Sequence, residues 1–186
     1  MRSLLVPAAL VLLSSAPAFA ATELSLPPFS AIETHGGGHV VLRHGATQRV
    51  TVIKGDLKIS QVAVKDGKLM VDPCPTSCWL RSQELEVEVV APRIEALAAH
   101  GGGSIQAQGP FPSQPNLAVA AHGGGSIDAR AIAAETVAAS VHGGGSIRVN
   151  AVATLAAEAH GGGSITYTGN PHVASSTHGG GSISHE

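Results

Sequence analysis

Histidine is the residue type whose spacing in this sequence points most directly to chemistry. The tetrapeptide His-Gly-Gly-Gly occurs six times in 186 residues, and five of the copies continue as Ser-Ile. The histidines of these five copies are His100, His122, His142, His160 and His178, at intervals of 18 to 22 residues. A degenerate copy, His35-Gly36-Gly37-Gly38-His39-Val40, lies earlier in the chain. Because neutral imidazole is a ligand for zinc, nickel and copper, the five histidines are a candidate metal site.

A repeating scaffold is needed to bring these histidines together. If each repeat forms one layer of a stack, the histidines form an external column with neighbours ~5 Å apart at the backbone. Two interpretations stay open: the rings share a metal ion, or they stack and hydrogen-bond the turn without any ligand. In either case, protonation of adjacent rings creates like-charge repulsion, so we expect stability to fall as the pH drops.

The residues on both sides of each glycine block alternate between apolar and polar types, which is typical of β-strands. An isoleucine stands five positions after each histidine, and a polar residue follows it. These isoleucines are Ile105, Ile127, Ile147, Ile165 and Ile183. A helix is the alternative for alanine-rich stretches such as Ala151 to Ala159, because alanine favours helix. The short distance between glycine blocks leaves little room for one.

The glycine blocks predict the corners of the repeating unit, because glycine permits positive φ and close backbone approach. The corner glycines are Gly101, Gly102, Gly103, Gly123, Gly124, Gly125, Gly143, Gly144, Gly145, Gly161, Gly162, Gly163, Gly179, Gly180 and Gly181. Identical turns at a period near twenty indicate stacked supersecondary units. We therefore predict an all-β fold, a single-domain β-solenoid, with a β-sandwich of hairpins as the alternative.

The chain divides into two regions by regularity. Residues 96–186 hold the regular repeats, and residues 24–95 predict less regular N-terminal rungs, with Phe29 and Trp79 as candidate caps. Five N-terminal segments read as strands. They are Val40 to Arg43, Arg49 to Ile53, Val62 to Val64, Lys68 to Val71 and Leu85 to Val89.

Residues 1–20 read as a secretory signal peptide. Arg2 provides the charged start, Leu4 to Leu13 the apolar core, and Ala18-Phe19-Ala20 the cleavage site. The apolar stretch is short for a membrane span, so an uncleaved anchor is the weaker alternative. We expect a mature chain of residues 21–186, without a membrane span, exported to the periplasm or the cell exterior.

Both cysteines lie in the segment Cys74-Pro75-Thr76-Ser77-Cys78. In an oxidising compartment, two cysteines this close predict a disulfide that pins a local turn. A redox or metal role is the alternative, but no histidine stands nearby with the spacing of a zinc finger.

Composition and motifs exclude several function classes. With 44% hydrophobic and 13% charged residues the chain is not disordered, and a net charge of −2 gives no reason to expect nucleic acid. His-Gly-Gly-Gly forms the oxyanion hole of some esterases, but the Gly-x-Ser-x-Gly nucleophile motif is missing from the sequence. The carboxylates Asp128, Glu135 and Glu158 stand at different phases of the repeat, and the turns lack the aspartate of calcium-binding repeats. We expect a protein that is not an enzyme.

The sequence resembles a bacterial family, the head GIN domain proteins, known as putative auto-transporter adhesins. The resemblance rests on Phe29-Ser30-Ala31-Ile32, Val40 to Leu42, Asp66-Gly67-Lys68-Leu69 and Ala91 to Leu97, and it covers nearly all of residues 21–186. The family's turns usually read Gly-Ser-Gly, so the added histidine is a departure. The resemblance implies a right-handed parallel β-helix without catalytic residues.

These observations predict an exported, non-enzymatic β-solenoid, a structural or adhesion-type binding module of the cell envelope. Its partner would be an unidentified ligand of the envelope or the cell surface. The alternative is a periplasmic metal-binding protein that uses the histidine column. After the fifth repeat the stack presents a strand edge, and open edges invite pairing, so we expect self-association through the C-terminal rung.

Overall fold

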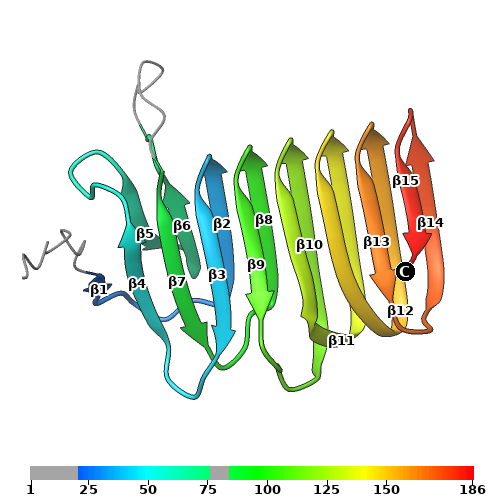
Figure 1. The fold of residues 1–186 in the computed structure, drawn as a ribbon. Helices are drawn as coiled ribbons and strands as arrows, with labels where there is room; N and C mark the ends of the chain where they lie inside the picture. Colours follow the sequence, from blue (N-terminus) through cyan, green and yellow to red (C-terminus); the bar gives the residue numbers. More distant parts are fainter. Residues whose placement is uncertain (1–20, 76–83) are drawn as a thin grey trace, which may run out of the picture.

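A computed structural model describes residues 21–75 and 84–186, and every regular element in these ranges is a β-strand (Figure 1). The predicted all-β class is confirmed. The strands are β1 (Thr22–Leu24), β2 (Ala31–Gly36), β3 (His39–His44), β4 (Arg49–Lys54), β5 (Gln61–Lys65), β6 (Lys68–Asp72), β7 (Glu86–Ala91), β8 (Ala96–Gly101), β9 (Ser104–Gln108), β10 (Gln114–Gly123), β11 (Ser126–Gly143), β12 (Ser146–Gly161), β13 (Ser164–Thr168), β14 (His172–His178) and β15 (Ser182–His185). All belong to one curled, mixed sheet.

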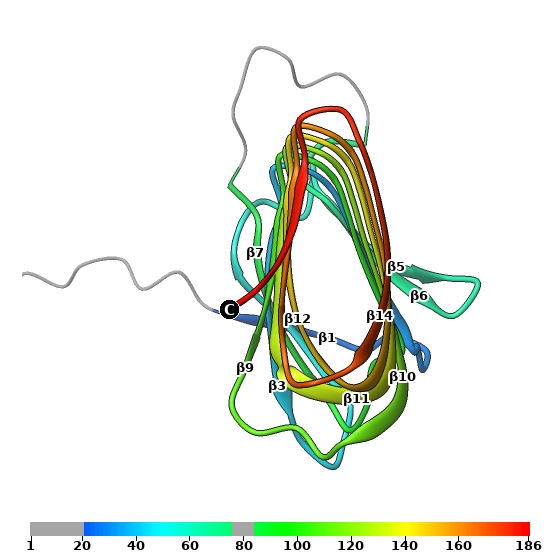
Figure 2. The same cartoon turned by 90° about the vertical axis from the view of Figure 1, so that its right-hand side faces the viewer.

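Successive repeats pair with each other in parallel and in register. On one side of the molecule the order is β2, β8, β10, β11, β12, β14, and on the other it is β3, β9, β11, β12, β13, β15. Strands β11 and β12 are long enough to bend from one side to the other. Viewed along the stack, the strands superpose as a flattened ring (Figure 2).

The two alternatives from sequence are wrong. Ala151 to Ala159 lies within β12, because its alternating small residues pack inward while the backbone pairs on both sides. In the described residues no ladder joins the two flanks of one Gly-Gly-Gly block, so these blocks do not close hairpins.

The N-terminal region departs from the expected wholly parallel arrangement. The five predicted strands are confirmed as β3 to β7, but β4 runs antiparallel to β1 and β7, and β5 antiparallel to β6. Local turns explain both reversals. Asp66 and Gly67 both have positive φ, 52° and 73°, which suits a tight hairpin between β5 and β6. A short link after β3 turns the chain back into β4, and β7 lies between the two.

The order of the stack also differs from the order of the chain. Strand β2 lies between β6 and β8, so the degenerate repeat at residues 35–40 sits directly against the first regular repeat. His35 pairs with His100 although 65 residues separate them in sequence.

The core follows from period-two alternation. In β9, β11 and β12 every second residue is buried except where β11 and β12 bend, and the isoleucines of the repeat form an inner ladder. Ile105, Ile127, Ile147 and Ile165 are at most 1% exposed, and Ile183 is half-buried in the last rung. Phe29 is buried at the N-terminal end.

Three predictions from sequence fall on residues that the structure leaves undescribed. The signal peptide, residues 1–20, Trp79 and the Cys78 half of the expected disulfide lie outside the described residues. Within the described ranges, no helix has the length and apolar character to cross a membrane.

Candidate functional site

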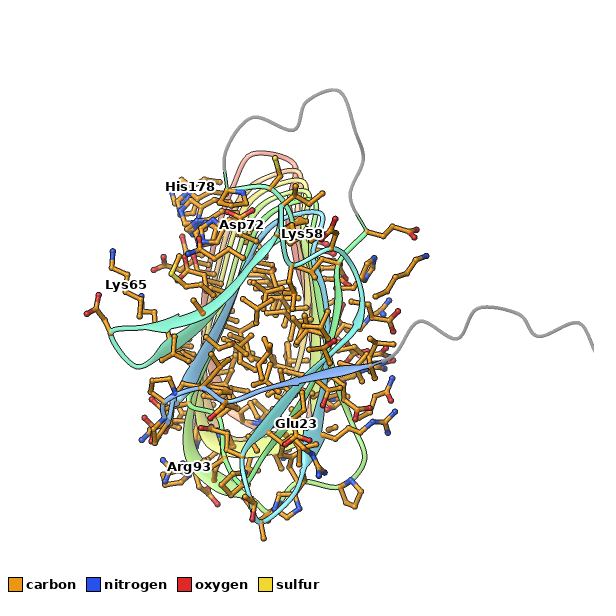
Figure 3. All side chains as sticks on the ribbon, turned by 90° about the vertical axis from the view of Figure 1, so that its left-hand side faces the viewer. Glu23, Lys58, Lys65, Asp72, Arg93 and His178 are labelled. Carbon is orange, nitrogen blue, oxygen red and sulfur yellow. The ribbon has the colours of Figure 1, made fainter. Side chains whose placement is uncertain are left out.

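The histidines of successive repeats form one column along the turn edge of the sheet. Parallel pairing places each of them beside the next in exact register, and the column begins one rung earlier than expected, at His35. From His35 through His100, His122, His142 and His160 to His178, the ring centroids are 5.0, 4.9, 5.0, 4.8 and 4.8 Å apart. Figure 3 shows His178 on the outside of the turn end. We call these six residues the histidine column.

The local cause of the column is the alternation that leads into each turn. The residue before each histidine points into the core, as Ala99, Ala121, Val141 and Ala159 do with full burial. The histidine side chain that follows therefore points outward. Each histidine of the column is half-buried or exposed. His35 was missed as a member of the column, although its degenerate motif was the available signal.

Ring orientation decides what the column can do with a metal ion. The pairs His35–His100, His142–His160 and His160–His178 are stacked, with interplanar angles of 10°, 5° and 2°. Nitrogen lone pairs lie in the ring plane, so stacked rings present their nitrogens side by side rather than toward a shared point. No cluster of three or more His, Cys, Asp or Glu side chains that could hold a metal ion occurs in the described ranges. The metal site at His100, His122, His142, His160 and His178 stays a prediction.

Glu33 is the polar partner at the N-terminal end of the column. Its Oε1 lies 2.9 Å from His35 Nε2 and 3.4 Å from His100 Nε2, and its Oε2 lies 3.7 Å from Lys68 Nζ. Sequence analysis did not identify Glu33. Its position two residues before His35, on the same face of β2, was the signal.

Burial lowers the pKa of His100 from its ordinary value. Glu33 opposes this effect, while His122, His35 and Lys68 add to it. A histidine whose pKa is lowered by folding binds its proton more readily in the unfolded chain. It therefore stabilises the fold at neutral pH and loses that contribution as the pH falls through the unfolded value near ~6.5.

Beside the histidine column runs a shallow groove of about 410 Å³ over β8, β10, β11 and β12. The side chains on its floor are small, because the outward positions two and four residues before each histidine hold mostly alanine. These outward residues are Ala96, Ala98, Ala118, Ala120, Ala138, Ser140, Ala156 and Glu158. We call this strip the alanine groove.

Serine and charged side chains elsewhere on the repeats contact one another. Ser126 Oγ and Ser146 Oγ are 3.1 Å apart across neighbouring rungs. Asp128 accepts hydrogen bonds from Arg130 Nε at 3.0 Å and Nη2 at 2.6 Å, and Arg130 also binds Glu186. Burial raises the pKa of Asp128, but the Arg130 hydrogen bonds outweigh it and hold that pKa below its ordinary value. Asp128 is thus engaged in an ion pair with Arg130.

A family model matches most of the chain. It is described as "Putative auto-transporter adhesin, head GIN domain" and matches residues 28–115 and 112–171. None of the curated proteins matches the sequence.

Two solved structures align with this chain at low sequence identity. A putative adhesin from Bacteroides fragilis is 18% identical, with a TM-score of 0.54, over 90% of this chain and 96% of that one. A putative cell adhesion protein from Clostridium sporogenes is 12% identical, with a TM-score of 0.44, over 90% and 99%. The first of these supports the fold and carries no further conclusion.

Proposed function

Because the chain belongs to the head GIN domain family of putative auto-transporter adhesins, we propose that it is an exported, non-enzymatic, adhesion-type binding module of the bacterial cell envelope. The observation that carries this proposal is the family match over residues 28–115 and 112–171, together with a long, regular face built from repeats. Stacked repeats build extended binding surfaces of this kind.

The architecture we propose is a right-handed parallel β-solenoid, formed by residues 21–186 after removal of a leader at residues 1–20. The in-register parallel ladders from β2 to β14 support the solenoid, and the antiparallel strands β1, β4 and β5 then cover its N-terminal end. The charge pairing of Asp128 with Arg130 is consistent with a role without catalysis.

The proposed function predicts saturable binding to a cell surface. The purified protein, carrying a fluorescent label, is applied to intact cells and to isolated envelopes of the producing bacterium at pH 7.5 and at pH 5.5. We expect binding that the unlabelled protein displaces, and we expect the native protein outside the cytoplasm on fractionation. A cytoplasmic location, or no displaceable binding to any envelope fraction, would contradict the proposal.

We also propose that two copies associate through β14. All seven residues of β14 are exposed, and among the described strands it pairs only with β12. Val173, 41% exposed, is in register with Leu155, which is fully buried. If two copies of β14 pair antiparallel with Ser175 opposite Ser175, Val173 of one copy lies opposite Thr177 of the other. The inward faces of the two copies then lie on the same side of the joined sheet. An assembly of this kind is a closed dimer, because the two-fold pairing uses the same strand edge of both copies.

Sedimentation tests this association. We expect a dimer that becomes populated as concentration rises, and we expect Val173→Lys to return the protein to monomer. Val152→Lys is the matched control, because Val152 is also exposed, at 43%, but lies within β12. A protein that stays monomeric at all concentrations, or equal effects of the two substitutions, would refute the pairing.

A further inference from the structure

The histidine column and the alanine groove form one continuous outer face of the sheet. The two features share β8, β10, β11 and β12, with the column at the turn edge and the groove beside it, and the column extends one strand further at each end, to β2 and β14. Six rungs at ~4.8 Å give the column a length of roughly 24 Å along the stack. Nothing in the proposed function says which chemistry this face recognises.

Protonation converts the column into a straight row of cations at intervals of 4.8 to 5.0 Å. The charged groups that face it are few. Glu33 contacts His35 and His100, Lys68 lies behind Glu33, and Glu158 stands two residues before His160. The central and C-terminal rungs otherwise carry neutral side chains, including Ser140 and Ser176, each within hydrogen-bond distance of its own histidine. In mildly acidic solution the face therefore has a net positive charge.

The shape of this face selects among anionic partners. Neutral sugars are held by aromatic platforms, and the outward residues of this face include none. An extended acidic peptide repeats its side chains on one face at ~6.6 Å, which does not match the column. A linear polysaccharide with an acidic group on each sugar is thin and unbranched, and the small side chains of the groove let it approach the backbone closely.

We propose that the histidine column and the alanine groove bind a linear acidic polysaccharide along the stack when the histidines are protonated. This inference rests on the proposed adhesion-type function and supplies its ligand class. Binding favours the protonated rings, so it takes up protons, and the polymer offsets the repulsion between neighbouring imidazolium ions. The site is thus active in acid and weak at neutral pH.

Polygalacturonate is the probe, and dextran of similar length is the uncharged control. Calorimetry at pH 5.5 is expected to show binding about tenfold tighter than at pH 7.5, which corresponds to ~1.4 kcal/mol, with none to dextran. His122→Gln combined with His142→Gln should weaken binding at pH 5.5 about tenfold. His44→Gln, at the exposed end of β3 away from the glycine turn and outside the column, should leave it unchanged. Circular dichroism at pH 5.5 verifies that each protein is folded.

A second measurement distinguishes binding to protonated histidines from non-specific binding. Repeating the calorimetry at pH 6 in buffers of different ionisation enthalpy should show net proton uptake on binding. Equal binding at both pH values, no proton uptake, or no effect of the double substitution would overturn the inference. Equal binding of duplex DNA would overturn the assignment to a polysaccharide. If polygalacturonate does not bind but the protein still binds envelopes at pH 7.5, this inference is wrong and the proposed function stands.

Discussion

Gly145→Ala is expected to destabilise the protein by about 1–3 kcal/mol, whereas Gly144→Ala one residue earlier should leave stability unchanged or slightly higher. The two glycines occupy the same turn but different environments. A Cβ at Gly145 would lie 2.6 Å from the carbonyl oxygen of Gly125 on the previous rung. A Cβ at Gly144 would meet nothing within 4 Å, and its φ is not in the left-handed region.

The contact at Gly145 is costly because it involves backbone and not a movable side chain. The Gly125 carbonyl accepts the hydrogen bond of the Ser146 N–H at 3.0 Å, so displacing it weakens the ladder between the two rungs. The same arrangement recurs at Gly163 and Gly181, where the nearest carbonyl oxygen would be 2.8 Å from the added Cβ. The third glycine of the motif is therefore required for stacking, and the second is not.

Urea unfolding of the native protein and the two variants measures this difference. The expected result is a lower midpoint for Gly145→Ala only, with the denaturant slope unchanged. Equal midpoints for the two variants would show that the turns do not approach one another as described.

Acidification from pH 7.5 to pH 5 is expected to lower the melting temperature through the histidine column. The pKa of His100 is lowered mainly by burial, so the folded protein binds fewer protons than the unfolded chain just below pH ~6.5. That deficit reduces the free energy of unfolding as the pH falls. Protonated neighbours about 5 Å apart add repulsion of roughly 0.8 kcal/mol per pair in a water-like medium.

The effect should depend on specific rings and on salt. His122→Gln combined with His142→Gln removes the two central charges, so the loss of melting temperature between pH 7.5 and pH 5 should shrink. His44→Gln, outside the column at the exposed end of β3, is the control and should leave the pH dependence as it is. Sodium chloride at high concentration should also narrow the difference, because salt screens exposed charges.

Glu33 should reduce the effect of acid at the N-terminal end of the histidine column. Its carboxylate lies 3.4 Å from His100 Nε2 and raises the pKa of that ring against the larger lowering by burial. Glu33→Gln should therefore increase the loss of stability in acid. Melting temperatures that are the same at pH 7.5 and pH 5 for the native protein would contradict the role of the column.

The structure of the repeats could be predicted well because every repeat has the same turn and the same kind of neighbouring residues. Identical turns and a fixed isoleucine imply identical positions, so the strands, the inner Ile ladder and the external column follow from alternation and period. The same alternation identified β3 to β7, since each is a short apolar-polar run between glycine or aspartate turns.

The direction of the N-terminal strands and the pairing of strands far apart in the sequence were harder to predict. The antiparallel direction of β4 and β5 depends on local turns, and a strand pattern is the same for both directions. The placement of β2 beside β8 joins segments separated by 59 residues, Gly37 to Glu95. Only that placement adds His35 to the column and Glu33 to its end, so the polar partner of the site could not be deduced from the regular repeats.

The central claim is that successive repeats lie in register, one rung above the next. Cross-linking with a short bifunctional thiol reagent, followed by mass spectrometry, tests it directly, with the native protein as background for Cys74 and Cys78. Ser126→Cys with Ser146→Cys should cross-link, because the two positions pair in adjacent rungs. Ser126→Cys with Ser164→Cys, two rungs apart, should not. A cross-link between Ser140→Cys and Arg148→Cys, on the two flanks of one turn, with none between positions 126 and 146, would contradict the stacked fold.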